Sequence, residues 1–171
     1  MSDAGSDDEG EKGPSIGTYE GDRDPESGAR QGQGKTVLPN GDTYTGGYQS
    51  GKRHGQGKYR FKKSQAIYEG EYSQGKKHGR GVFHYPDGSK YDGQWVDDLR
   101  SGHGVYTHAN GDTYDGEWAN NVREGRGVYT YSLTGSKFEG LWTRDRRAGH
   151  GIIHHTNHKF SGTFVDDQVP N

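Results

Sequence analysis

The sequence has no cysteine and few of the residues that build an aliphatic core. Without Cys, disulfides, thiolate metal sites and a cysteine nucleophile are excluded. Hydrophobic residues make up only 25% of the chain, and mean hydropathy is −1.27. No apolar run approaches the roughly 20 residues of a membrane-spanning helix. The N-terminus also lacks the layout of a signal peptide. We therefore expect a soluble protein of the cytoplasm.

Low hydrophobicity taken alone predicts an unfolded chain, but two features oppose that outcome. Net charge is only −2, so charge repulsion does little to keep the chain expanded. The chain also contains 12 Tyr and 3 Trp, whose large rings can pack in place of aliphatic side chains. Acidic residues gather in residues 1–16, which we expect to form a disordered tail. Residues 17–171 are expected to form the folded part.

One pattern recurs along the folded part, with copies about 23 residues apart. Each copy starts with an aromatic residue, and these starts are Tyr19, Tyr44, Tyr68, Tyr91, Tyr114, Phe138 and Phe160. Glycine follows two residues after every start, and a second ring follows two residues later in every copy but the first. Because alternate residues of a strand share a face, each copy opens with a strand that presents ring, glycine and ring on one side.

Turn signals and a second glycine pattern complete each copy. Gly, Asp or Asn follows the first strand, as at Gly75 and Asn121, and these residues tolerate the positive φ of tight hairpin turns. A Gly-x-Gly pair, such as Gly102 and Gly104, then opens a second strand. Two residues beyond the pair, further rings share its face, at Tyr59, Phe83, Tyr106 and Tyr129. Rings of neighbouring strands can therefore lie flat over the glycines. The pattern predicts an all-β protein, an elongated single-layer antiparallel β-meander built of tandem β-hairpin repeats. About six and a half repeats give some thirteen strands.

The repeat pattern resembles a known family, the MORN (membrane occupation and recognition nexus) repeat. The resemblance is carried by Tyr91-Asp-Gly-Gln-Trp95, Gly102-His-Gly104 and Asn110-Gly111-Asp112, and it extends over about residues 17–165. Further details, among them the stretch Thr134-Gly-Ser-Lys137, are similar to the MORN proteins of the radial spoke head. This resemblance implies a structural subunit of the cilium or flagellum axoneme. Such a subunit binds other radial spoke head subunits and supports regulation of beating.

A scaffold role needs a surface, and the sequence suggests two candidates. A single-layer sheet has no second layer to cover its rings, so we expect an exposed aromatic face for protein binding. Its central residues are Tyr91, Trp95, Tyr114, Trp118, Phe138 and Trp142. The last strand would leave unpaired backbone groups at Phe160, Gly162 and Phe164, which favours strand addition by a partner or self-association.

Other functional classes have weaker support. Successive histidines lie a full repeat apart and the acidic residues follow a regular open sheet, so we expect no metal, no cofactor, no small-molecule substrate and no enzymatic activity. The repeat array carries little net positive charge, which argues against nucleic acid. The alternative is a peripheral membrane tether, in which basic turns such as Lys52-Arg53 and Lys76-Lys77 bind anionic lipid.

Overall fold

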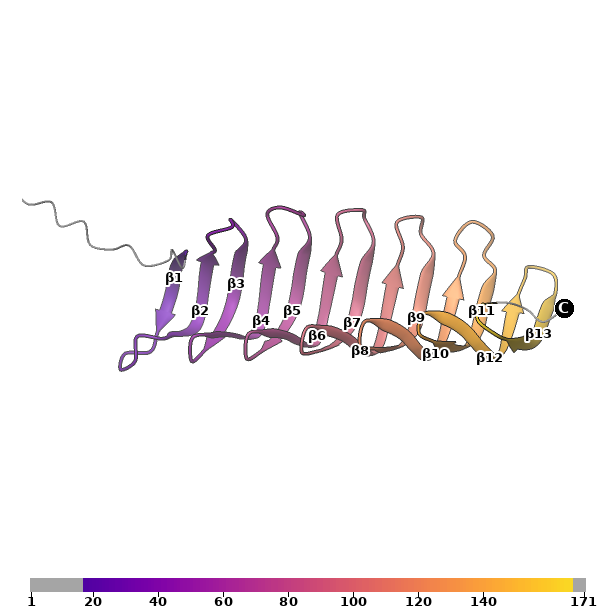
Figure 1. Ribbon diagram of the computed structural model, residues 1–171. Helices are drawn as coiled ribbons and strands as arrows, with labels where there is room; N and C mark the ends of the chain where they lie inside the picture. Colours follow the sequence, from indigo (N-terminus) through magenta and orange to yellow (C-terminus); the bar gives the residue numbers. More distant parts are fainter. Residues whose placement is uncertain (1–16, 168–171) are drawn as a thin grey trace, which may run out of the picture.

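A computed structural model describes residues 17–167, which form one antiparallel sheet of 13 strands. The strands lie side by side in sequence order, and Figure 1 shows the elongated array that results. The expected acidic tail, residues 1–16, lies outside the described residues. The strands are β1 (Thr18–Arg23), β2 (Arg30–Val37), β3 (Thr43–Gln49), β4 (Lys52–Arg60), β5 (Ile67–Ser73), β6 (Lys76–His84), β7 (Lys90–Val96), β8 (Leu99–Thr107), β9 (Thr113–Ala119), β10 (Val122–Thr130), β11 (Lys137–Thr143), β12 (Arg146–His154) and β13 (Lys159–Phe164).

The all-β, single-layer meander predicted from the repeats is confirmed. Each unit pairs an odd-numbered strand with the even-numbered strand that follows it, and a two-residue turn joins them from the second unit onward. Between β9 and β10 the turn residues Asn120 and Asn121 have φ angles of 49° and 73°. Positive φ at both central residues is the type I′ arrangement, which matches the twist of the flanking strands. The predicted turn chemistry is therefore correct.

Paired glycines form a column through the middle of the sheet. Gly116 of β9 lies opposite Gly127 of β10, and the ring of Tyr114 lies over both. A Cβ atom at Gly127 would overlap the atoms of that ring. The expectation that rings lie flat over bare backbone is confirmed, because only glycine leaves room for so close an approach.

The even-numbered strands are bent, which the sequence did not predict. In β10 the first glycine of the Gly-x-Gly pair, Gly125, has a φ of 85°, and the register shifts between Arg123 and Gly127. β10 begins at Val122, so the pair lies inside the strand. The expectation that this pair opens the second strand is wrong. A bulge at a positive-φ glycine bends a strand and increases its local twist.

The bulge also frees a backbone carbonyl. Opposite the bulge, the carbonyl of Glu117 accepts a hydrogen bond of 2.9 Å from the hydroxyl of Tyr114. The same bond recurs in neighbouring units, from Tyr91 to Gln94 and from Tyr68 to Glu71. Each ring is therefore fixed at both its hydroxyl and its face, and the polar tip of a buried tyrosine is satisfied.

Candidate protein-interaction face

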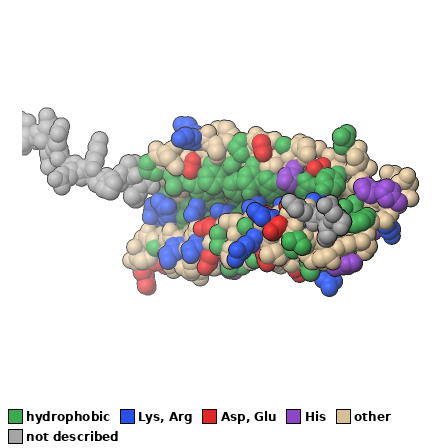
Figure 2. Space-filling view, turned by 45° about the vertical axis from the view of Figure 1, so that its right-hand side comes forward, with side chains coloured by type: hydrophobic (Ala, Val, Ile, Leu, Met, Phe, Trp, Pro, Cys, Tyr) green, Lys and Arg blue, Asp and Glu red, His purple; other side chains and the backbone are tan. Residues whose placement is uncertain are grey.

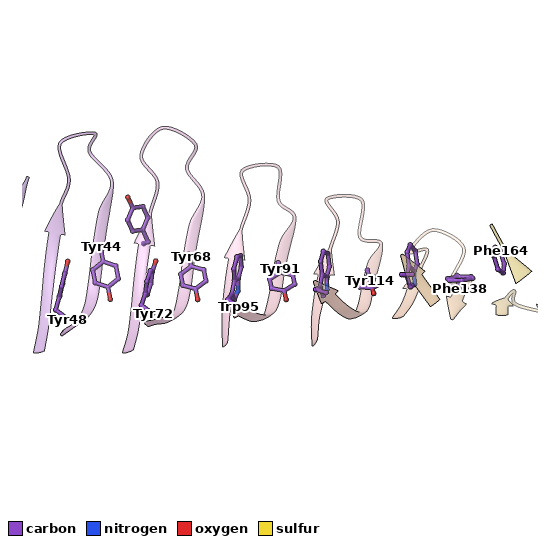
Figure 3. Close-up of a cluster of buried hydrophobic side chains, with 12 residues drawn as sticks. Tyr44, Tyr48, Tyr68, Tyr72, Tyr91, Trp95, Tyr114, Phe138 and Phe164 are labelled. Carbon is purple, nitrogen blue, oxygen red and sulfur yellow. The ribbon is translucent and has the colours of Figure 1, made fainter. Parts of the chain in front are cut away.

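The rings at the two strand positions predicted from the sequence form a buried ladder along the concave side of the sheet (Figure 3). We call this set the core ladder: Tyr44, Tyr48, Tyr68, Tyr72, Tyr91, Trp95, Tyr114, Trp118, Phe138, Trp142 and Phe164. Tyr114 contacts Trp118 of its own strand and Trp142 two strands on, at centroid distances of 5.3 and 5.2 Å. Both pairs are edge-to-face, the arrangement that aromatic quadrupoles favour.

The expectation that these rings are exposed is wrong. Tyr91, Tyr114 and Phe138 are 0% exposed, and Trp118, the most exposed of the six central residues, is only 6% exposed. Indole nitrogens are also used within the chain, since Trp118 Nε1 donates 3.1 Å to the carbonyl of Gly104. The six residues thus form the core of this protein, because the bent even-numbered strands and the basic side chains beside them cover the rings.

A row of basic side chains covers the core ladder. We call it the basic row; one member comes from the start of each even-numbered strand: Arg30, Arg53, Lys77, Arg100, Arg123 and Arg147. The guanidinium carbon of Arg100 lies 4.5 Å from the ring centroid of Trp118. A cation over an aromatic face is attracted by the ring quadrupole, and the side-chain stem covers apolar surface.

From Arg53 onward, each basic side chain also reaches the hairpin turn of the next unit. At three positions that turn offers a carboxylate: Lys77 Nζ lies 3.0 Å from Asp98, and Arg123 Nε lies 3.1 Å from Asp145. Arg147 pairs with Asp167 in the same way. The basic row therefore joins consecutive units through charge-assisted hydrogen bonds.

Three positions of the basic row have no carboxylate in the next hairpin turn: Arg30, Arg53 and Arg100. Arg53 donates 2.7 Å to the backbone carbonyl of Gly75, and Arg100 donates 2.6 Å to that of Asn121. Neither turn residue carries a carboxylate, so the positive charges of these two guanidinium groups are left uncompensated by the turn. Both side chains are partly exposed.

A second set of rings runs beside the core ladder, and all of them except the buried Tyr59 are only partly buried. We call it the aromatic stripe: Tyr59, Phe61, Phe83, Tyr85, Tyr106, His108, Tyr129 and Tyr131. Consecutive rings touch along the whole set, as in Phe83 to Tyr85 at 4.6 Å and Tyr85 to Tyr106 at 5.8 Å. Figure 2 shows a continuous hydrophobic band along the molecule with Lys and Arg side chains beside it. The stripe is thus a contiguous, partly exposed apolar surface.

Hydrogen bonds hold the stripe in place. Tyr129 donates its hydroxyl to Asp112 Oδ2 at 3.0 Å, and the backbone N–H of Ser132 donates 2.8 Å to Asp112 Oδ1. The backbone N–H of Ser132, aided by the Tyr129 hydroxyl, lowers the pKa of Asp112 although burial opposes this. Burial, with the nearby Asp112, raises the pKa of Tyr129 to about 12. Burial above all lowers the pKa of His108.

A hollow of about 160 Å³ lies between the aromatic stripe and the basic row. Its walls include Tyr106 and His108 of the stripe, Arg100 and Arg123 of the basic row, and Trp118 of the core ladder. Asp145 also lines the hollow and pairs with Arg123, so Arg100 supplies the positive charge that no carboxylate of the lining pairs with. Apolar ring surface and a cationic edge thus meet in one depression. Such a combination suits a partner segment that is both apolar and acidic.

The opposite face of the sheet is polar and has a larger, open hollow of about 620 Å³. It is lined by His103, Asp115, Gly116, Glu117, Arg126, Gly127, Val128, Glu139, Gly140, Leu141, His150, Gly151 and Ile152. His103 Nε2 lies 2.9 Å from Asp115 Oδ1, and His150 Nε2 lies within hydrogen-bond distance of Ser161 at 3.1 Å. This side is marked by exposed polar and charged groups and has no ring ladder.

Within residues 17–167, no group of three or more His, Asp or Glu side chains is arranged to hold a metal ion. No helix in the same residues is long and apolar enough to cross a membrane. The absence of cofactor, substrate and enzymatic activity stays a prediction.

The predicted edge residues lie in β13, which pairs with β12 along one side. Phe160 is 42% exposed, whereas Phe164 is 1% exposed and contacts Phe138 at 4.9 Å. Phe164 therefore belongs to the core ladder. Strand addition at Phe160, Gly162 and Phe164 concerns backbone groups and, like self-association, stays a prediction.

Sequence reasoning found only half of the aromatic stripe. It placed Tyr59, Phe83, Tyr106 and Tyr129 on the ring side of the second strands, but assigned them no role. It missed the rings two residues further along, at Phe61, Tyr85, His108 and Tyr131, where the strand has just ended. The available signal was the same alternation continued by one step, since a ring or imidazole follows at each of these positions.

Comparison with known proteins agrees with this architecture. A model of the MORN repeat matches residues 26–43, 44–65, 68–90, 91–113, 114–132 and 138–158. The chain is similar to the radial spoke head 1 homolog of Cyprinus carpio, 58% identical over 50 residues, which span 29% of this chain and 22% of the carp protein. Its counterpart in Mus musculus is 54% identical over 50 residues, which span 29% of this chain and 16% of the mouse protein.

A solved structure with a similar fold is the TCP domain of SAS-4 (dCPAP) from Drosophila melanogaster, in complex with a proline-rich motif of Ana2 (dSTIL). The similarity covers 78% of this chain and 73% of that one, with a TM-score of 0.52 and 15% identity. At that identity the likeness concerns the fold alone. The repeat matches extend over most of residues 26–158, and from residue 44 onward each one coincides with a strand pair. The chain belongs to the MORN-repeat family.

Proposed function

We propose that this chain is a non-catalytic structural subunit of the axonemal radial spoke head, and that it binds neighbouring subunits along its aromatic stripe. In this role it supports the regulation of ciliary and flagellar beating. Two relatives bear the name radial spoke head 1 homolog, and each is identical to this chain at more than half of 50 aligned positions. Those segments span at most 22% of the relatives, so they support a shared origin for part of the molecule.

The observation that carries the proposal is the partly exposed, continuous stripe. A lone exposed ring on a surface needs no explanation, but contiguous apolar surface of this kind marks protein interfaces. Tyrosine, phenylalanine and arginine are also the residue types that interfaces favour. The stripe lies on a rigid sheet whose rings are fixed by hydrogen bonds such as Tyr129 to Asp112. A partner therefore meets a surface that is already ordered, which lowers the entropy lost on binding.

The membrane-tether alternative has less to support it. The basic row points onto the core ladder; the side chains of Lys77 and Arg123 are only 18% and 21% exposed. The outward cations are partly paired as well, since Lys76 Nζ lies 3.7 Å from Asp97. Little unpaired positive charge is thus presented as one continuous surface to lipid headgroups.

Affinity purification from ciliated cells tests the proposal. The tagged chain is compared with the stripe variant Tyr85→Ala/Tyr131→Ala, which removes two rings of the aromatic stripe. The control is Leu141→Ala, which removes a 42% exposed side chain on the opposite face. We expect radial spoke subunits with the wild type and the control, and a loss of about tenfold or more with the stripe variant. Thermal midpoints check that all three proteins are folded.

Liposome co-sedimentation of the same proteins separates the two functions. Recovery of spoke subunits without binding to acidic vesicles supports the scaffold. Strong binding to acidic vesicles that is equal for the wild type and the stripe variant, with no recovery of spoke subunits, would support the membrane tether in place of the scaffold.

A further inference from the structure

The aromatic stripe has a spacing that selects one kind of partner backbone. Equivalent rings, Phe83 of β6, Tyr106 of β8 and Tyr129 of β10, recur once per unit, two strands apart in the sheet. Neighbouring strands lie about 4.8 Å apart, so equivalent rings recur at about 9.6 Å along the sheet. A chain that lies along the stripe must present matching side chains at that interval.

Only one regular backbone matches this interval with the same face. A polyproline II helix rises about 3.1 Å per residue with three residues per turn, so every third side chain returns to the same face after about 9.3 Å. In an extended strand every third residue spans about 10 Å, but it points to the opposite side. In an α-helix the same face returns after seven residues, or about 10.5 Å, so its mismatch per unit is about three times that of polyproline II.

We propose that the aromatic stripe binds a proline-rich segment in the polyproline II conformation, laid across the strands with one turn per repeat unit. This inference rests on the proposed function, because it names the partner segment of the same face. Proline rings pack well against aromatic surface, and the segment loses little entropy because its conformation is already fixed. The depression bounded by Tyr106, His108 and Trp118 is the place for one such ring.

The basic row adds a charge requirement to the segment. Arg53 at the start of β4 and Arg100 at the start of β8 donate to the carbonyls of uncharged turn residues, Gly75 and Asn121. They lie two units, or about 19 Å, apart. Six residues of polyproline II span about 18.6 Å. The segment therefore carries acidic residues six positions apart, beside its line of prolines.

Synthetic peptides test this inference without altering the protein. A fluorescent peptide with proline at every third position and Glu residues six apart is titrated with the full chain, and anisotropy is recorded. A second peptide has the same composition with proline at every fourth position, and a third keeps the proline spacing but sets the Glu residues four apart. We expect the first to bind about tenfold tighter than the second, about 1.4 kcal/mol, with the third in between.

The Tyr85→Ala/Tyr131→Ala protein should lose this preference, whereas Leu141→Ala should keep it. Equal affinity for the every-third and every-fourth peptides overturns the inference, as does binding of the first peptide that is unchanged in the stripe variant. If the peptides show no preference while the stripe variant still loses its spoke subunits, the scaffold proposal stands and the polyproline inference falls. If the preference is found but no spoke subunits are recovered, the scaffold proposal falls and the peptide site stands.

Discussion

The guanidinium carbon of Arg123 lies 4.3 Å from the ring centroid of Trp142, in the hairpin of the next unit. Arg123 also donates through Nε to Asp145 at 3.1 Å. One side chain therefore covers a core ring and holds the turn that follows it. In a fold with a single sheet layer, contacts of this kind replace the missing second layer.

Truncation of Arg123 should destabilise the protein more than truncation of an exposed arginine does. Its side chain is 21% exposed, so Arg123→Ala removes a cation–π contact, packing surface and the bonds to Asp145. We expect the free energy of unfolding to fall by about 2 kcal/mol, measured by urea denaturation. Arg146→Ala is the matched control, because the Arg146 side chain is 61% exposed, and it should change stability by less than about 0.5 kcal/mol. Equal effects would mean that Arg123 does not cover the core.

Addition of one methyl group to the glycine column should be as damaging. In Gly127→Ala the new Cβ meets the ring of Tyr114, which is 0% exposed and has no room to move. We expect a loss of about 2 to 3 kcal/mol by thermal or urea unfolding. Val128→Ala, the neighbouring position on the other face, should cost about 1 kcal/mol. A neutral Gly127→Ala would show that the ring does not lie over this glycine.

Asp112 should make the free energy of unfolding depend on pH in the acidic range. Its pKa is lowered in the folded protein, so its contribution is complete above the unfolded value of about 4 and is lost as pH falls through the lower, folded value. Asp112→Asn should be less stable at pH 7, and its stability should fall less between about pH 5 and pH 2. Parallel pH profiles for the two proteins would contradict the role assigned to this carboxylate.

Buried tyrosines should limit stability at the alkaline end. Burial above all raises the pKa of Tyr91 to about 12. The folded state favours the neutral phenol, so its contribution is present below the unfolded value of about 10 and is lost as pH rises through the folded one. Tyr91→Phe cannot ionise there and should lose less stability between about pH 10 and pH 12. Tyrosinate absorbance that titrates fully at the unfolded value would refute this burial.

Local chemistry explains why so much of the fold could be predicted. Alternation of ring and glycine, as at Tyr114 and Gly116, sets the strand faces, and Asn121 sets a hairpin turn. These signals lie within a few residues of each other, and each has one structural solution. The strand order follows, because short turns leave neighbouring strands no choice but to pair.

The site was harder to predict because its burial depends on contacts between units. A strict two-residue alternation treats each strand as flat, whereas the positive φ of Gly125 bends β10 over the rings. Nothing near Trp142 in the sequence indicates that Arg123, about one repeat earlier, covers it. Alternation alone therefore predicts that the rings of the core ladder are exposed. It identifies only half of the partly exposed aromatic stripe.

The central claim is that the aromatic stripe, and not the opposite face, contacts spoke subunits. Site-specific photo-cross-linking inside assembled spoke heads tests it most directly, with a benzoylphenylalanine placed at Tyr85, at Tyr131 or at Leu141 in separate proteins. The account predicts cross-links to radial spoke subunits from positions 85 and 131 and only background from position 141. Cross-links from position 141 with none from the two stripe positions would contradict it.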